Sequence, residues 1–179
     1  MPQNPLSKNT GKSAPTASDA KTVVISHVFD APRELVFEAW TQPEYLARWF
    51  APHDCEFHIE RIDVRPGGGF HSCIRDGSFE CWCVGTYIEI VRPERLVYTL
   101  AIADEDGNKV SPESVGHDAR WPAETLLTVT FEELGGKTRL TLEQDVSESL
   151  AKETGAYPSW IEMLERLDGL LEELSVSLA

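Results

Sequence analysis

An amphipathic stretch near the C-terminus, residues 157–178, constrains this chain more than any other feature. Its apolar residues recur every three or four positions, which predicts a helix with one apolar face and one acidic face. Pro158 suits the first turn, where no N–H partner is needed. Such a helix is about 30 Å long, roughly the length of a strand of nine or ten residues, so it can lie along a whole sheet. The apolar face consists of Trp160, Met163, Leu164, Leu167, Leu170, Leu171, Leu174 and Leu178.

The rest of the chain predicts one strand, two short helices and then six strands. Residues 22–29 are β-branched and aromatic, as in a strand. Pro32 opens the first helix, and the capping-box spacing from Thr41 to Glu44 predicts the start of the second. Period-two patterns then predict strands at about 56–64, 70–75, 79–91, 96–103, 125–132 and 138–145. Residues 147–154 add a helical turn or two. Because a meander of twisted strands curls, the final helix is expected to fill its concave face.

Two hairpins give testable registers. Asp76-Gly77 is a two-residue turn signal, which predicts the pairs Ile74–Phe79, Ser72–Cys81 and Phe70–Cys83, with His71 opposite Trp82. The turn at Gly135-Gly136 predicts the pairs Val129–Leu140 and Leu127–Leu142. The polar segment 104–122 is a long loop of the kind that forms lids or is mobile, and Trp121 at its end is placed to close the mouth of a cavity.

Composition limits the partners. The net charge of −14 and a polar stretch at residues 1–20 predict one acidic domain over 21–179 behind a disordered tail. Nucleic acid and anionic membranes repel such a surface, and without a signal-like segment we expect a cytoplasmic protein. The cysteines are expected to be free thiols. Cys81 and Cys83 share a strand face, so a soft-metal site with His71 or Cys73 is an alternative, although buried apolar cysteines are the expectation and no cofactor or metal is predicted.

Several segments resemble the activator of heat-shock-protein-90 ATPase homologue family, within the START and birch-allergen-like (SRPBCC) superfamily. The resemblance spans about residues 23–174 and is carried by residues 31–37, 43–49, 63–68, 85–87, 93–97 and 136–142, together with Trp160, Leu164 and Leu167. The chain departs from the family pattern at Phe50, where a tryptophan is usual, and at Pro158-Ser159, where glycines usually precede the tryptophan.

The resemblance implies an α+β helix-grip fold of order β-α-α-β6-α, with an apolar cavity between the long helix and the curved sheet. The expected function is a carrier or sensor of a small apolar molecule, such as a lipid. Direct chaperone activation is not expected, because only a short polar tail stands where the eukaryotic co-chaperone has a further domain. The candidate cavity residues are Trp49, Phe57, Phe70, His71, Trp82, Tyr87, Tyr98, Trp121, Trp160, Met163 and Leu167.

Two alternatives stay open. One is a cyclase- or aromatase-like enzyme that positions a bound apolar substrate, with His71, His58, Asp63 and Tyr87 as the available acid–base types and no hydrolase or metalloprotease motif. Asp63 is more simply explained by an ion pair with Arg65, and His53 and His117 fall in loops where solvent exposure is expected. The other is a stress-response or protein-interaction module, with a second copy of the chain as one candidate partner and Arg33 and Arg48 on the short helices as candidate contacts.

Overall fold

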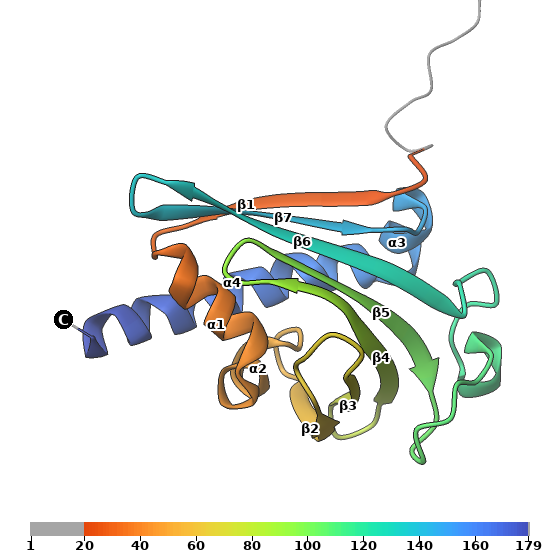
Figure 1. The fold of residues 1–179 in the computed structure, drawn as a ribbon. Helices are drawn as coiled ribbons and strands as arrows, with labels where there is room; N and C mark the ends of the chain where they lie inside the picture. Colours follow the sequence, from red (N-terminus) through yellow and green to blue (C-terminus); the bar gives the residue numbers. More distant parts are fainter. Residues whose placement is uncertain (1–19, 179) are drawn as a thin grey trace, which may run out of the picture.

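The structure, a computed structural model, describes residues 20–178 and forms one curved antiparallel sheet of seven strands (Figure 1). The strand order is β1-β7-β6-β5-β4-β3-β2, so the last strand of the meander pairs with the first strand of the chain. The bounds are β1 (Val23–Phe29), β2 (Glu56–Ile62), β3 (Gly69–Arg75), β4 (Glu80–Val91), β5 (Arg95–Ala103), β6 (Glu124–Leu134) and β7 (Lys137–Gln144).

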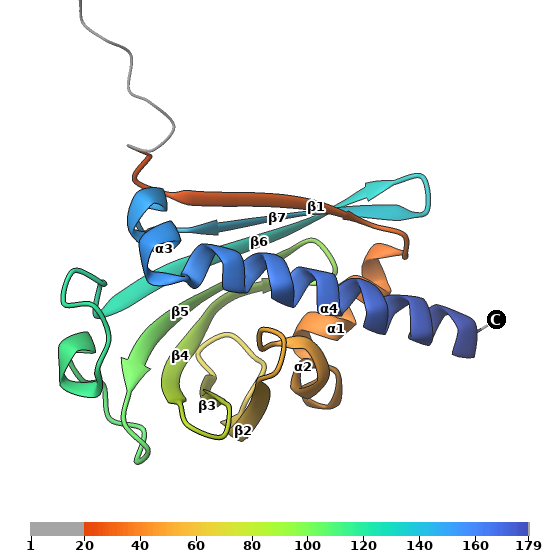
Figure 2. The ribbon, with the colours of Figure 1, turned by 180° about the vertical axis from the view of Figure 1, so that it is seen from behind.

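The long C-terminal helix lies along one face of this sheet (Figure 2). It is α4 (Ala156–Ser177), preceded by the short α3 (Glu148–Thr154). Two further short helices, α1 (Arg33–Thr41) and α2 (Pro43–Trp49), connect β1 to β2 and lie beside α4 (Figure 2). The predicted order β-α-α-β6-α and the helix-grip arrangement are therefore confirmed.

The predicted apolar face of the terminal helix forms part of the core. All of its residues from Trp160 to Leu171 are buried, and each buried side chain of this size contributes about 1.5–3 kcal/mol relative to exposure. They pack with aromatic residues of the short helices, among them Trp40 and Trp49. Leu178 is an exception, because it follows the last residue of α4 and is 77% exposed.

The boundary between α1 and α2 is set by proline rather than by the predicted capping box. Thr41 belongs to α1 and donates its hydroxyl to the Phe37 carbonyl (2.9 Å), so its oxygen does not cap α2. Gln42 is the N-cap residue and makes no side-chain cap. Since a residue before proline avoids the helical region, Pro43 holds Gln42 at φ −86° and ψ 122° and ends α1 there.

The β3–β4 register differs by two residues from the predicted one. The turn comprises residues 76–79, and Arg75 pairs with Glu80. The difference in register follows from the Asp76 carboxylate. It accepts hydrogen bonds from the backbone N–H groups of Ser78 (2.7 Å) and Phe79 (2.9 Å), and these stabilise a four-residue turn in place of the predicted two-residue turn. The pairs are therefore Ile74–Cys81, Ser72–Cys83, Phe70–Gly85 and His71–Val84.

The β6–β7 register is also displaced by two residues from its prediction. Gly135 and Gly136 have φ values of 57° and 88°, as a two-residue turn with positive φ requires, and Leu134 pairs directly with Lys137. Both strands thus continue to the glycines, and the pairs are Val129–Leu142, Phe131–Leu140 and Leu127–Gln144. Because the displacement is even, each side chain keeps its predicted face.

The segment between β5 and β6 is ordered by its own contacts. It contains one turn of 3₁₀ helix, η2 (Pro112–Val115), and Arg120 binds the carboxylates of Asp118 (2.8 Å) and Glu153 (2.8 Å). The second of these contacts ties the segment to α3.

The predicted ion pair of Asp63 with Arg65 is present, with the Asp63 carboxylate 2.7 Å from the Arg65 guanidinium.

The predicted disordered tail falls on residues 1–20, which lie outside the described residues except for Ala20. Across residues 20–178, no helix has the length and apolar character needed to cross a membrane.

Candidate functional site

The main cavity of the described chain lies between α4 and the concave face of the sheet and has a volume of about 250 Å³. The first two turns of α4 supply Ala156, Ser159, Trp160 and Met163 as one wall. The opposite wall comes from β3 to β7. Two connecting segments complete the lining of the cavity. The segment between β5 and β6 supplies His117, Asp118 and Trp121, and the segment after α2 supplies Pro52 and Cys55. We call this the large cavity.

The polar groups of one wall of the large cavity bind one another. Trp160 Nε1 donates to the Gln144 side-chain oxygen (3.0 Å), and Gln144 Nε2 donates to the Thr125 hydroxyl (3.1 Å). That hydroxyl in turn donates to the Leu100 carbonyl (3.4 Å). A buried polar group without a partner is costly. Because these hydrogen bonds pair the polar groups of this wall with one another, an apolar ligand can lie against it and leave none of them unpaired.

Arg166 of α4 fixes the segment that closes the large cavity beside α2. Its guanidinium donates to the carbonyls of Ala51 (2.6 Å), Pro52 (3.1 Å) and Cys55 (3.2 Å) at one nitrogen, and to the Arg48 carbonyl (3.1 Å) at the other. Three carbonyls of an irregular segment thereby gain a charged donor. The position of Pro52 and Cys55 in the cavity wall follows from this contact.

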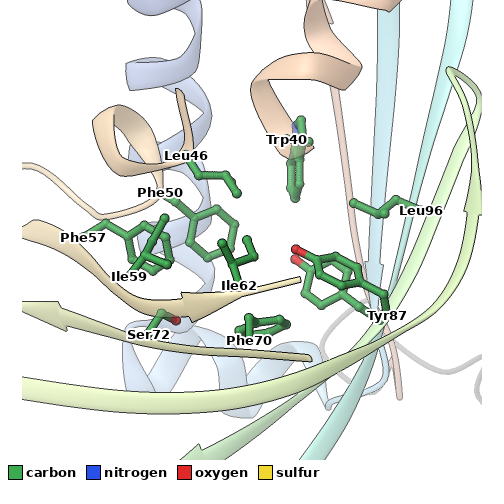
Figure 3. A pocket seen from close by; sticks show the side chains of 11 residues that line it. Trp40, Leu46, Phe50, Phe57, Ile59, Ile62, Phe70, Ser72, Tyr87 and Leu96 are labelled. Atoms are coloured by element: carbon green, nitrogen blue, oxygen red, sulfur yellow. The ribbon is translucent and has the colours of Figure 1, made fainter. Parts of the chain in front are cut away.

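A second, small cavity of about 30 Å³ lies under α1 and α2 (Figure 3). It has room for a water molecule but not for a ligand. Tyr87, Tyr98, Ser72 and Trp40 line it with polar groups, and burial raises the pKa of both tyrosine hydroxyls, so they stay protonated. The Tyr98 hydroxyl is buried without a hydrogen-bond partner within the described chain. A polar atom placed beside this donor would remove that cost.

Phe50 lines both cavities and forms the wall between them. Its ring contacts those of Trp49 (centroids 5.1 Å apart), Phe57 (5.0 Å) and Trp160 (5.6 Å). These edge-to-face and tilted contacts hold the ring in place. Phe50, one of the two places where the chain departs from the family pattern, therefore lies where the two cavities meet.

Two cysteines and a histidine also face the large cavity. Cys81 and Cys83 lie two residues apart on β4 with their sulfur atoms 4.0 Å apart, and His117 reaches the same cavity from the segment after β5. His117 is half-buried rather than solvent-exposed as expected, a placement that depends on the fold of its loop. Over residues 20–178, no three His, Cys, Asp or Glu side chains are placed to hold a metal ion.

The candidate cavity residues fall into three groups. Trp121, Trp160 and Met163 line the large cavity, while Phe57, Phe70, Tyr87 and Tyr98 line the small one. Trp49 and Leu167 line neither, because both are completely buried in the core. His71 and Trp82 also line neither, since alternate residues of a strand point to opposite faces and theirs is the outer face.

The acid–base residues considered for an enzyme do not come together. His71 packs against Trp82 (ring centroids 4.8 Å apart) and contacts the Asp104 carbonyl (3.3 Å) on the outer face. His58 contacts Glu60 (3.1 Å), and Asp63 is bound to Arg65 in an exposed turn. Only Tyr87 faces a cavity. Arg166 and His117, which do shape the large cavity, were not among the predicted site residues, because their positions depend on contacts between distant parts of the chain.

Comparison with solved structures supports the fold. A protein from Arthrobacter aurescens is 24% identical with a TM-score of 0.74, and the match covers 90% of this chain and 92% of that one. A protein from Chromobacterium violaceum is 24% identical with a TM-score of 0.70, covering 85% and 97%. The AHSA1 protein from Silicibacter pomeroyi is 17% identical with a TM-score of 0.66, covering 87% and 99%. At these identities the similarity concerns the fold alone.

No functionally curated protein matches the chain. A family model does: the one described as "Activator of Hsp90 ATPase homolog 1-like protein" matches residues 30–172, which is most of the sequence and includes every element from α1 to most of α4. That agrees with the segments that carry the resemblance. The chain therefore belongs to the Activator of Hsp90 ATPase homolog 1-like family.

Proposed function

We propose that the protein binds a small apolar molecule in the large cavity and acts as its carrier or sensor. The observation that carries this proposal is the cavity itself, about 250 Å³ between α4 and the concave sheet. Ligand sites in proteins are concave and mostly apolar, with a few placed polar groups. The cavity is partly open to the surface, so a molecule can enter it from solvent.

The walls favour an apolar ligand over a polar one. Leu100, Ile102, Trp121, Trp160 and Met163 offer hydrocarbon and ring surface, and the Thr125–Gln144–Trp160 chain is satisfied internally. A strongly polar ligand would lose its water without finding enough partners here. An apolar ligand has no comparable hydration to lose on entering the cavity. Each square ångström of apolar surface that it buries contributes roughly 25 cal/mol to the free energy of binding.

Titration with N-phenylnaphthylamine, an uncharged probe whose fluorescence rises in apolar surroundings, tests this proposal. We expect saturable binding to one site per chain. Ser159→Trp places a large ring in the cavity and is expected to weaken binding by roughly tenfold or more, about 1.4 kcal/mol.

The matched control is Ser177→Trp, the same change at the exposed last residue of the same helix, which is expected to leave the affinity unchanged. Thermal unfolding of both variants checks that they are folded. Absence of saturable binding to the unaltered protein would refute the proposal, and equal affinities of the two variants would place the probe elsewhere.

A further inference from the structure

Cys81, Cys83 and His117 form a cluster that the proposed ligand binding does not use. Side chains two apart on a strand share a face, so both cysteines point from β4 into the large cavity, with their sulfur atoms 4.0 Å apart. His117 comes from the segment after β5 and lines the same space. All three residues are half-buried, so each keeps surface that a molecule in the cavity can reach.

The cluster favours a thiolate at Cys81. The Cys83 thiol lowers the pKa of Cys81 to about 5; burial opposes this effect, and the His117 imidazole adds to it. The pKa of Cys83 is raised, chiefly by its hydrogen bond with Cys81, so it keeps its proton. Cys81 in turn raises the pKa of His117. At neutral pH the Cys81 thiol is thus in its nucleophilic form, and the raised pKa of the His117 imidazole favours the protonated form of that ring beside it.

The other charged groups around the cavity do not oppose this arrangement. Asp118 is held by Arg120 (2.8 Å), and burial raises the pKa of the Cys55 thiol, which stays neutral. The face of α4 that lines the cavity carries only uncharged residues from Ala156 to Met163. Cys55 therefore provides an internal comparison, because it is a thiol that opens on the same cavity but whose pKa burial raises despite the nearby Arg166 guanidinium.

We propose that the large cavity captures, covalently and through Cys81, apolar ligands that contain an electron-poor carbon–carbon double bond. This rests on the proposed function, since the ligand must first enter the cavity. The Cys81 sulfur forms a bond to the β-carbon, the carbon–carbon π bond breaks, and its electron pair moves toward the α-carbon and the adjoining carbonyl. The His117 imidazolium gives its proton to the α-carbon and becomes neutral. The product is a thioether, and no oxidant or reductant is needed.

Alkylation by N-phenylmaleimide, followed by intact-mass and peptide mass spectrometry, tests the proposal. We expect Cys81 to react at least about tenfold faster than Cys55, since only Cys81 is a thiolate at neutral pH. Its rate should stay nearly constant from pH 8 down to roughly pH 6, fall to half near pH 5 and continue to fall below that. An ordinary thiol with a pKa of about 8.5 would instead lose about tenfold in rate per pH unit over this range.

Variants and matched reagents assign the effect. Cys81→Ser is expected to abolish the fast reaction, and His117→Gln to move its pH midpoint upward. Cys73→Ser, the matched control at a thiol that lines neither cavity, should leave the rate unchanged. N-phenylsuccinimide lacks the double bond and should compete with N-phenylnaphthylamine without adding mass. Maleimidopropionic acid, which carries a charge, should react with Cys81 more slowly than N-phenylmaleimide does.

The outcomes separate the two proposals. If the fluorescent probe binds but Cys81 reacts no faster than Cys55, covalent capture is wrong while ligand binding stands. Should neither the probe bind nor Cys81 react, both proposals fail. Equal rates for the charged and the apolar maleimide would also overturn the inference, because the cavity would then not select the reagent. Loss of two hydrogens to a Cys81–Cys83 disulfide, in place of an adduct, would show a redox pair and not a capture site.

Discussion

Arg166 fixes the part of the large-cavity wall that follows α2. Three of its four hydrogen bonds to backbone carbonyls hold residues 51–55 against α4, and the fourth goes to the Arg48 carbonyl of α2. Hydrogen bonds with a charged partner contribute about 1.5–3 kcal/mol each, and carbonyls left without donors add a penalty. We expect Arg166→Met to lower the free energy of unfolding by about 2–4 kcal/mol, measured by urea denaturation.

The matched control for this prediction is Arg48→Met. Arg48 makes an exposed ion pair with Glu173 (2.6 Å), and pairs of this kind contribute less than about 1 kcal/mol. Equal losses in the two variants would mean that the carbonyl contacts of Arg166 do not stabilise the segment.

Single residues are also where sequence-based expectations went furthest from the structure. The pattern around Arg166 showed only a charged residue on the polar side of a helix, and His117 only a histidine in a loop. Their roles depend on which carbonyls and sulfur atoms come close in the fold, and no local periodicity contains that information. Asp76 is an intermediate case. Its carboxylate accepts hydrogen bonds from the backbone N–H groups of the residues that follow it, which is a local property, and these bonds make the turn longer than the two residues that Asp76-Gly77 predicts.

At the scale of elements, the junction of α3 and α4 depends on one glycine. Gly155 has φ 86°, and both helices end or begin there. A side chain at this φ costs about 1–2 kcal/mol, although a Cβ would meet no atom within 4 Å. Gly155→Ala is therefore expected to destabilise the protein by about 1 kcal/mol, measured as a shift in the midpoint of thermal unfolding.

Gly169 supplies the opposite case within the same helix. It lies in the interior of α4, where a Cβ also meets nothing within 4 Å. Alanine is the better helix former by roughly 0.5–1 kcal/mol, so Gly169→Ala is expected to stabilise the protein by that amount. Changes of the same sign in the two variants would contradict the conformational argument at Gly155.

Elements were predicted well because they follow from periodicity and from proline and glycine. The bounds of α4 and of the seven strands agree with the patterns to within a few residues. Registers were less accurate, since each hairpin depends on the exact turn. Their displacement by two residues preserved the faces, so Cys81 and Cys83 stayed on the predicted side although their partners changed.

At the scale of the whole molecule, the sheet and its helix create the space in which function is proposed. The concave face and a helix long enough to cover it were both predictable from the sequence, and so was a cavity between them. Its division into a large and a small part was not, because it depends on the packing of a few aromatic rings. That the side chains of His71 and Trp82 point away from the cavities was not predicted from the sequence. It depends on which face of β3 and β4 is the concave one, and the structure supplies that.

Phe50 determines this division, and its replacement tests how the two cavities relate. Phe50→Leu removes the ring contacts with Trp49, Phe57 and Trp160, which contribute about 0.5–1.5 kcal/mol each, so we expect a stability loss of about 1–3 kcal/mol. The same change joins the cavities, and N-phenylnaphthylamine should bind at least as tightly as before. Phe50→Trp narrows both cavities and should weaken binding by roughly tenfold.

Phe79→Leu is the matched control, because Phe79 also lines the large cavity but is 46% exposed and does not border the small one. It is expected to cost less than half as much stability as Phe50→Leu and to leave the cavities separate. A crystal structure of Phe50→Leu would show the joined space directly. Weaker probe binding to Phe50→Leu together with unchanged binding to Phe50→Trp would mean that this ring supports the site by contact with the ligand, and not by limiting the volume available to it.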